Sequence, residues 1–93
     1  MGRLTKKFIA LEFARRAKQF HPDEDPMSID LWGLFSWGSV SYLIRSGEIL
    51  GPGYSKVNQT IWCKPSQEFF DKHIEPLMKL SIKEIWKQLG INI

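Results

Sequence analysis

The chain has 93 residues, of which 43% are hydrophobic and 13% aromatic, so it can form a packed core and differs from a disordered sequence. Its one cysteine, Cys63, excludes an internal disulfide and favours a reducing, cytoplasmic setting. We find neither a signal-peptide pattern nor the run of about 18 apolar residues that a membrane span requires. We therefore expect one domain, residues 1–93, that does not enter a membrane.

The net charge of +3 is unevenly distributed along the chain. Four of the ten acidic residues lie between Asp23 and Asp30, and elsewhere thirteen basic residues face six acidic ones. The first twenty residues contain six basic residues and a single acid, Glu12. This asymmetry favours a polyanionic partner such as nucleic acid, although a solvated face on a basic helix gives the same pattern.

Residues 4–20 have the apolar spacing of an amphipathic helix. The helix should end at His21-Pro22, because the residue before a proline is pushed out of the helical region. The acidic segment HPDEDP that follows indicates a loop, in which Asp23 or Asp25 acts as a cap or a solubilising residue. The residues expected on the buried face are Ile9, Ala10, Phe13, Ala14, Ala17 and Phe20.

Two further helices are predicted in the middle of the chain. Residues 28–35 indicate one or two turns, with Ser28 as the N-cap and Phe35 in the apolar row. Residues 37–46 indicate a second helix that Gly47 ends in a left-handed cap. Its inward face would consist of Trp37, Val40, Leu43 and Ile44, and its outer face of Ser39, Ser41, Tyr42, Arg45 and Ser46.

Residues 48–63 predict a β-hairpin, because two short apolar or β-branched segments flank a Gly/Pro-rich, polar stretch. Gly51-Pro52-Gly53 is expected to form a turn. A helix should then begin after Ser66 and be interrupted at Pro76. Residues 81–90 carry a capping box at their start and a glycine at their end, which predicts a helix that packs on the core or joins a homodimer.

No catalytic or metal-binding constellation is found in the sequence. His21 and His73 are far apart, and Cys63 with His73 supplies only two of the four ligands that a zinc site needs. Cys63 is better explained as a buried structural thiol. Gly51-Pro52-Gly53 lacks the lysine and hydroxyl residue of a phosphate-binding loop. We therefore expect a protein without enzymatic activity, metal or cofactor.

The predicted order of elements suggests DNA binding. Residues 4–63 give helix, loop, short helix, helix and hairpin, the order of a helix-turn-helix with a wing. In that arrangement the helix over residues 37–46 would enter the major groove, with Ser39, Ser41, Tyr42 and Arg45 toward the bases. Phosphate contacts would come from the wing and the first helix, through Tyr54, Lys56, Lys6, Lys7, Arg15 and Arg16.

The segment SVSYLIRSGEILGPGYSKVNQTIWCKPSQEFFDKHI resembles phage excisionases and the wider group of MerR-like winged-helix proteins. The matching pieces are a helix near Ser39–Ser46, a short strand, the Gly51-Pro52-Gly53 segment, an aromatic strand at Ile61-Trp62, and a helix from Ser66. The resemblance implies a mainly α, winged helix-turn-helix-like fold with a small β-hairpin. It also implies an architectural factor or small regulator that binds double-stranded DNA from a phage or mobile element, and assists a recombinase in DNA recombination.

The aromatic content leaves a second function open. Twelve of the 93 residues are Trp, Tyr or Phe, more than so small a core obviously needs. Exposed aromatics are common anchors in protein interfaces. The alternative is therefore a small protein-binding module, an inhibitor or adaptor, in which charge reversals on the first helix would be harmless and aromatic substitutions damaging.

Overall fold

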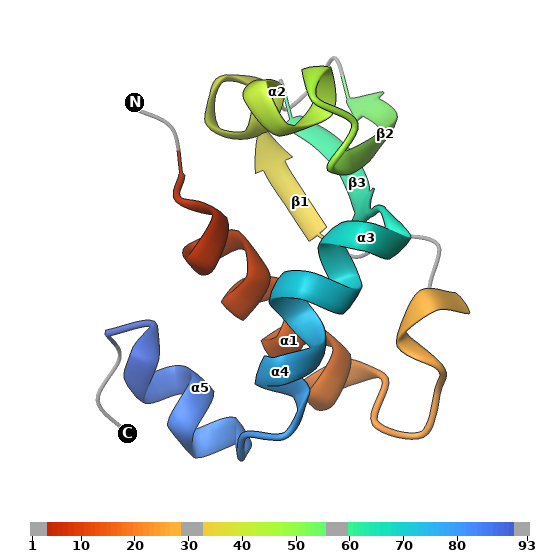
Figure 1. Ribbon diagram of the computed structural model, residues 1–93. Helices are drawn as coiled ribbons and strands as arrows, with labels where there is room; N and C mark the ends of the chain where they lie inside the picture. The colour runs from red at the N-terminus through yellow and green to blue at the C-terminus, as the bar shows by residue number, and fades with distance from the viewer. Residues whose placement is uncertain (1–3, 29–32, 56–59, 91–93) are drawn as a thin grey trace.

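The computed structural model describes residues 4–28, 33–55 and 60–90, which form a mainly α structure with a small antiparallel sheet (Figure 1). The helical segments are α1 (Lys6–Phe20), the 3₁₀ turn η1 (Pro26–Ser28), α2 (Trp37–Arg45), α3 (Gln67–Phe69), the π-helical η2 (Phe70–Ile74), α4 (Glu75–Met78) and α5 (Ile82–Gln88). The strands are β1 (Gly33–Ser36), β2 (Ile49–Ser55) and β3 (Thr60–Pro65). In Figure 1 the sheet and α2 lie at one end of the molecule and α5 at the other, with α1 between them.

The central helix is α1, which contacts β1, η2, α4 and α5. It begins where the side chain of Thr5 accepts a hydrogen bond from the Phe8 amide at 3.1 Å, a cap that satisfies one free N–H group. The predicted core residues are confirmed with one exception. Phe20 is 61% exposed, because it is the last residue of α1 and adjoins the exposed loop at Pro22–Asp25. The buried residues of α1 are Ile9, Ala10, Leu11, Phe13, Ala14 and Ala17.

Three aromatic rings hold the centre of the core together. The Phe13 ring meets the Phe35 ring edge to face with 5.7 Å between centroids, and the Phe69 ring in the same manner at 6.5 Å. Edge-to-face pairs place the positive ring edge against the negative ring face and stabilise by about 0.5–1.5 kcal/mol beyond area burial. Phe13 of α1 therefore connects the sheet to the C-terminal helices.

The helix predicted for residues 28–35 is wrong over residues 33–35. Gly33–Ser36 forms β1 and pairs antiparallel with Thr60–Cys63 of β3, while Ile29–Trp32 lies outside the described residues. A segment this short gains little from helix formation alone, whereas β3 offers partners for its backbone groups. Burial of Phe35 against Phe13 stabilises the strand further.

The predicted hairpin is confirmed as β2 and β3, but the turn predicted at Gly51-Pro52-Gly53 is wrong. These residues belong to β2, and the register shifts between Leu50 and Gly53, which is the irregularity that an inserted residue produces. Pro52 can sit there because β2 is an edge strand in the order β1-β3-β2, where a missing N–H group costs little. The connection from Ser55 to Thr60 lies outside the described residues.

The C-terminal helices begin at predicted serine caps. Ser66 accepts a hydrogen bond from the Phe69 amide and Ser81 from the Glu84 amide, each at 3.1 Å. The interruption predicted at Pro76 takes the form of η2, in which the Glu75 amide donates to the Phe70 carbonyl. A wider turn before Pro76 is a physical response to the hydrogen bond that proline cannot make. Helix α5 then packs on α1 through the buried Ile85.

Candidate nucleic-acid interface

Helix α2 lies across the sheet, contacts β1 and β2, and presents one narrow face to solvent. Val40 and Leu43 are fully buried, which fixes the side of the helix that meets the core. On the opposite side Gly38 and Arg45 are exposed and Ser41 is half-buried. The helix ends as predicted at Gly47, whose φ of 81° lies in the left-handed region that glycine adopts without strain.

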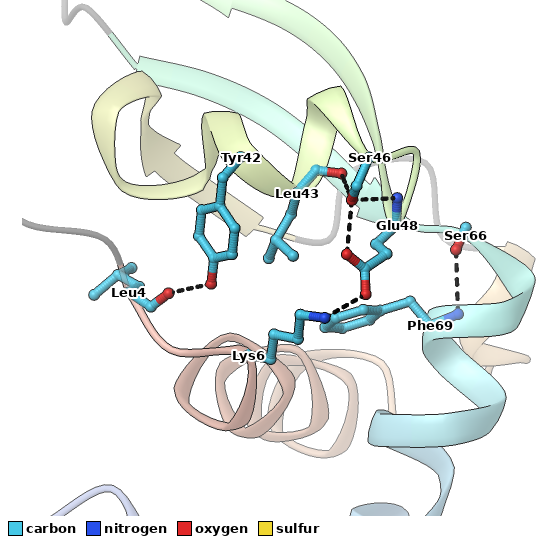
Figure 2. Close-up of polar contacts among 8 residues, drawn as sticks. All are labelled: Leu4, Lys6, Tyr42, Leu43, Ser46, Glu48, Ser66 and Phe69. Carbon is cyan, nitrogen blue, oxygen red and sulfur yellow. Dashed lines mark hydrogen bonds and ion pairs between the residues drawn. The ribbon is translucent and has the colours of Figure 1, made fainter.

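Two residues expected to reach DNA face the protein instead. Ser39 is only 5% exposed, and its carbonyl accepts a hydrogen bond from the Leu4 amide at 3.1 Å. The Tyr42 hydroxyl donates to the Leu4 carbonyl, as Figure 2 shows. Both residues therefore attach the segment before α1 to α2. Neither hydroxyl lies on the exposed face of α2. The buried side of this helix includes these two polar residues as well as its apolar ones.

Lys6 forms an ion pair with Glu48, a residue 42 positions later in the chain. Its Nζ lies 2.8 Å from Oε1 of Glu48, at the α2–β2 junction (Figure 2). The Ser46 hydroxyl lies 2.7 Å from Oε2 of the same carboxylate and 3.0 Å from the Leu43 carbonyl. The hydrogen bonds from Lys6 and Ser46 lower the pKa of Glu48, and the bond to Glu48 raises the pKa of Lys6. Lys6 thus joins α1 to α2.

Arg15 and Arg16 share one carboxylate on α1. Nη2 of Arg15 lies 2.9 Å from Oε2 of Glu12, its Nε lies 3.2 Å from Oε1, and the Arg16 Nε lies 3.4 Å from Oε2. The Arg15 guanidinium also donates to Gln19 and lies 4.9 Å from the centre of the Trp86 ring. With side chains only 13% and 15% exposed, Arg15 and Glu12 form a shielded pair that helps to hold α5 against α1.

Two of the predicted cationic contacts are available to a partner. Lys7 and Arg45 are exposed, and within residues 4–28, 33–55 and 60–90 neither has an ion-pair partner. Tyr54 belongs to β2, where its backbone lies opposite Ile61. Lys56 lies outside the described residues. Among the described cations of the predicted set, Lys6, Arg15 and Arg16 therefore form ion pairs within the chain, whereas Lys7 and Arg45 do not.

The sequence analysis did not identify the carboxylates that form ion pairs with Lys6, Arg15 and Arg16. Glu12 precedes Arg15 by three residues and Arg16 by four, a spacing that places these side chains together on a helix and could have been read from the sequence. The pairing of Lys6 with Glu48 spans 42 residues and has no local signal.

Two other reactive side chains are Cys63 of β3 and His73 of η2. Cys63 is buried as predicted, and burial raises the pKa of its thiol to about 12, so it stays protonated near neutral pH. The His73 ring packs on Phe69 with 4.8 Å between centroids. Burial, with help from Lys72, lowers the pKa of His73. In the part of the chain that the structure describes, no three His, Cys, Asp or Glu residues are grouped closely enough to bind a metal ion.

Comparison with family models, with curated proteins and with solved structures gave no match for this chain. Among the described helices none has the length and apolar character needed to cross a lipid bilayer.

Proposed function

We propose that this protein binds double-stranded DNA without catalysing a reaction, through the exposed face of α2 and the adjoining β2–β3 hairpin. The observation that carries the proposal is the position of Arg45. It is exposed in the last turn of a helix that leads directly into the hairpin, and no ion pair among the described residues occupies its charge. A guanidinium so placed suits guanine or a phosphate.

The arrangement of the sheet supports a winged-helix reading of this surface. The chain runs α1, β1, α2, β2, β3, and β3 lies between β1 and β2. Helix α2, which precedes the hairpin, contacts β1 and β2 of the sheet to which the hairpin belongs. Among the described residues α2 is preceded by β1 where the expected arrangement has a short helix. Winged helix, excisionase-like role and recombinase partner all belong to this proposal.

The proposed interface is smaller than the sequence predicted. It consists of Ser41 and Arg45 on α2, Lys7 near the start of α1, Tyr54 of β2, and Lys56, which lies outside the described residues. Five predicted residues are left out because they are buried or already bonded within the chain. Ser39 is buried and Tyr42 donates a hydrogen bond to Leu4. The other three form ion pairs: Lys6, Arg15 and Arg16. So few cations predict binding with a shallow salt dependence, since each neutralised phosphate contributes about −0.9 to the log–log slope.

The test is binding to random double-stranded DNA as the salt concentration is raised, followed by selection of a preferred site. Arg45→Ala should weaken binding by about 1–3 kcal/mol. If Arg45 reads a base, the loss falls on the preferred site and Arg45→Lys does not restore it, because lysine lacks the two-pronged geometry. If it contacts a phosphate, the loss is equal on all sequences and Arg45→Lys restores most of it.

A matched control is Lys87→Ala, which removes an exposed cation from α5 at the other end of the molecule (Figure 1). This variant should bind DNA as the unaltered protein does. Equal losses for Arg45→Ala and Lys87→Ala would show that binding follows net charge alone. Absence of binding at low salt would refute the proposed function.

A further inference from the structure

An open groove lies at a distance from α2, between the loop after α1 and the junction of α4 with α5. One wall is the loop, which contributes His21, Pro22, Glu24 and Pro26. The other wall contains Met78, Ser81 and Ile82, and the floor contains Ala17 and Lys18 from the last turns of α1. None of these residues belongs to the proposed DNA interface.

Hydrogen bonds within the chain hold both walls in place. In the loop, Nδ1 of His21 lies 3.0 Å from Oε1 of Glu24, and the Glu24 amide donates to the His21 carbonyl. On the other wall, Nζ of Lys18 donates to the Met78 carbonyl at 3.0 Å, which ties the end of α4 to α1. The charge of Lys18 is therefore directed toward the protein, and the groove has a shape before any partner arrives.

The two walls differ in chemistry. The loop carries three exposed acids in succession, Asp23, Glu24 and Asp25, in a chain whose net charge is +3. Of these, Glu24 lines the groove and Asp23 is its neighbour in the chain, whereas Oδ1 of Asp25 accepts a hydrogen bond from the Met27 amide. The opposite wall offers the partly exposed apolar side chains of Met78 and Ile82. Phe20, directly before the loop, is 61% exposed. An occupant that matches both walls has apolar side chains on one side and basic side chains on the other.

We propose that this groove docks a segment of a partner protein that carries Lys or Arg beside apolar side chains. Charge complementarity selects this occupant, because Glu24 in the groove and the exposed Asp23 beside it repel the phosphates of nucleic acid and attract ammonium and guanidinium groups. The apolar wall supplies the burial that a purely electrostatic contact lacks. The site does not depend on the proposed DNA function, since the two surfaces share no residue.

The proposal is tested on the full chain, labelled with ¹⁵N, by titration with three short synthetic amphipathic peptides. The first combines Leu with Lys, the second replaces Lys by Glu, and the third replaces Leu by Ser. We expect the Leu/Lys peptide alone to shift the amide signals of residues 17–26 and 78–82. Equal binding of the Ser/Lys peptide would reduce the site to a general acidic patch and overturn the proposal.

Charge reversal provides the second arm. The double variant Asp23→Lys, Glu24→Lys should weaken the Leu/Lys peptide roughly three- to tenfold and strengthen the Leu/Glu peptide. The matched control Asp71→Lys reverses an exposed acid on η2 and should change neither affinity. If the double variant binds both peptides as the unaltered protein does, the loop carboxylates do not select the occupant.

The third arm varies the apolar wall and the protein concentration. Met78→Ser should weaken the Leu/Lys peptide while thermal unfolding shows that the fold persists, because Met78 is only partly buried. Groove signals that shift with protein concentration in the absence of peptide would identify a second copy of the chain as the occupant, and would overturn the proposal of a separate partner.

Discussion

Arg15 and Arg16 of α1 share the Glu12 carboxylate and lie near aromatic rings, whereas Arg45 of α2 is exposed and has no ion-pair partner within the described residues. The guanidinium carbon of Arg15 lies 4.9 Å from the Trp86 ring centre and that of Arg16 lies 5.9 Å from the Phe35 ring centre. On α1 these arginines contribute to packing, because the helix is surrounded by other elements. On α2 the arginine remains available, because it is exposed and no described carboxylate pairs with it.

The difference shows that a basic stretch in a sequence overstates the charge that a partner can reach. Of six predicted cationic contacts, four lie within the first helix and its start, and three of those four are paired with carboxylates of the chain. A shared carboxylate leaves one net charge for two arginines, and shielding fixes both side chains in place. The comparison indicates that the arginines of α1 contribute to stability, and it leaves Arg45 of α2 for the proposed interface.

The largest expected effect on stability is that of Arg15→Ala. The change removes the ion pair with Glu12, the hydrogen bond to Gln19 and the contact with Trp86. We expect the free energy of unfolding to fall by about 1–3 kcal/mol, since a shielded charged group loses its partner. Urea unfolding at neutral pH measures it.

The control for this change is Arg45→Ala, which should alter the free energy of unfolding by less than about 0.5 kcal/mol, as exposed positions usually do. A large loss of stability in Arg45→Ala, or none in Arg15→Ala, would reverse the roles assigned to the two helices. Arg15→Lys should be intermediate, because lysine keeps the charge and loses the two-pronged contact with Glu12.

A smaller effect is expected for Tyr42→Phe. This change deletes the hydroxyl that donates to the Leu4 carbonyl and keeps the ring. The free energy of unfolding should fall by about 0.5–1.5 kcal/mol, the net value of one hydrogen bond. DNA affinity should stay the same under conditions where the protein is folded. A loss of affinity with unchanged stability would return Tyr42 to the interface that the sequence predicted.

The smallest effect concerns the ion pair of Lys6 with Glu48. Because the pKa of Glu48 in the folded protein is lower than its ordinary value of 4.5, the pair stabilises the fold above that pH. The contribution is lost as the pH falls through the folded pKa. The unaltered protein should therefore lose more stability on acidification than Glu48→Gln does, as urea unfolding between about pH 5 and pH 3 measures. Parallel curves would show that the pair contributes nothing.

Local signals in the sequence were sufficient for the ends of most helices. Ser66 and Ser81 accept the expected capping hydrogen bonds, and Gly47 and Gly90 have the expected positive φ angles of 81° and 86°. These features depend on residues within one turn of each other, so a single chain segment contains all the information. The burial of Cys63 and the hairpin over β2 and β3 also followed from local composition.

The candidate interface could be predicted only in part. The exposed position of Arg45 followed from helical periodicity, because the buried Val40 and Leu43 define the opposite side. The burial of Ser39 could not be foreseen, because a small hydroxyl residue is compatible with either side of a helix. Its surroundings include Leu4, which is 35 positions earlier in the chain.

The amino-acid sequence by itself determined where most of the described helices start and stop, because caps and left-handed glycines act over a few residues. Tertiary structure decided that residues 33–36 form a strand, since their pairing partner on β3 lies about 27 residues away. It also decided which basic side chains form ion pairs, because Lys6 and Glu48 come together only when α1 packs beside the α2–β2 junction. Ion pairs between residues far apart in the sequence depend on the folded structure, so the local order of residues does not predict them.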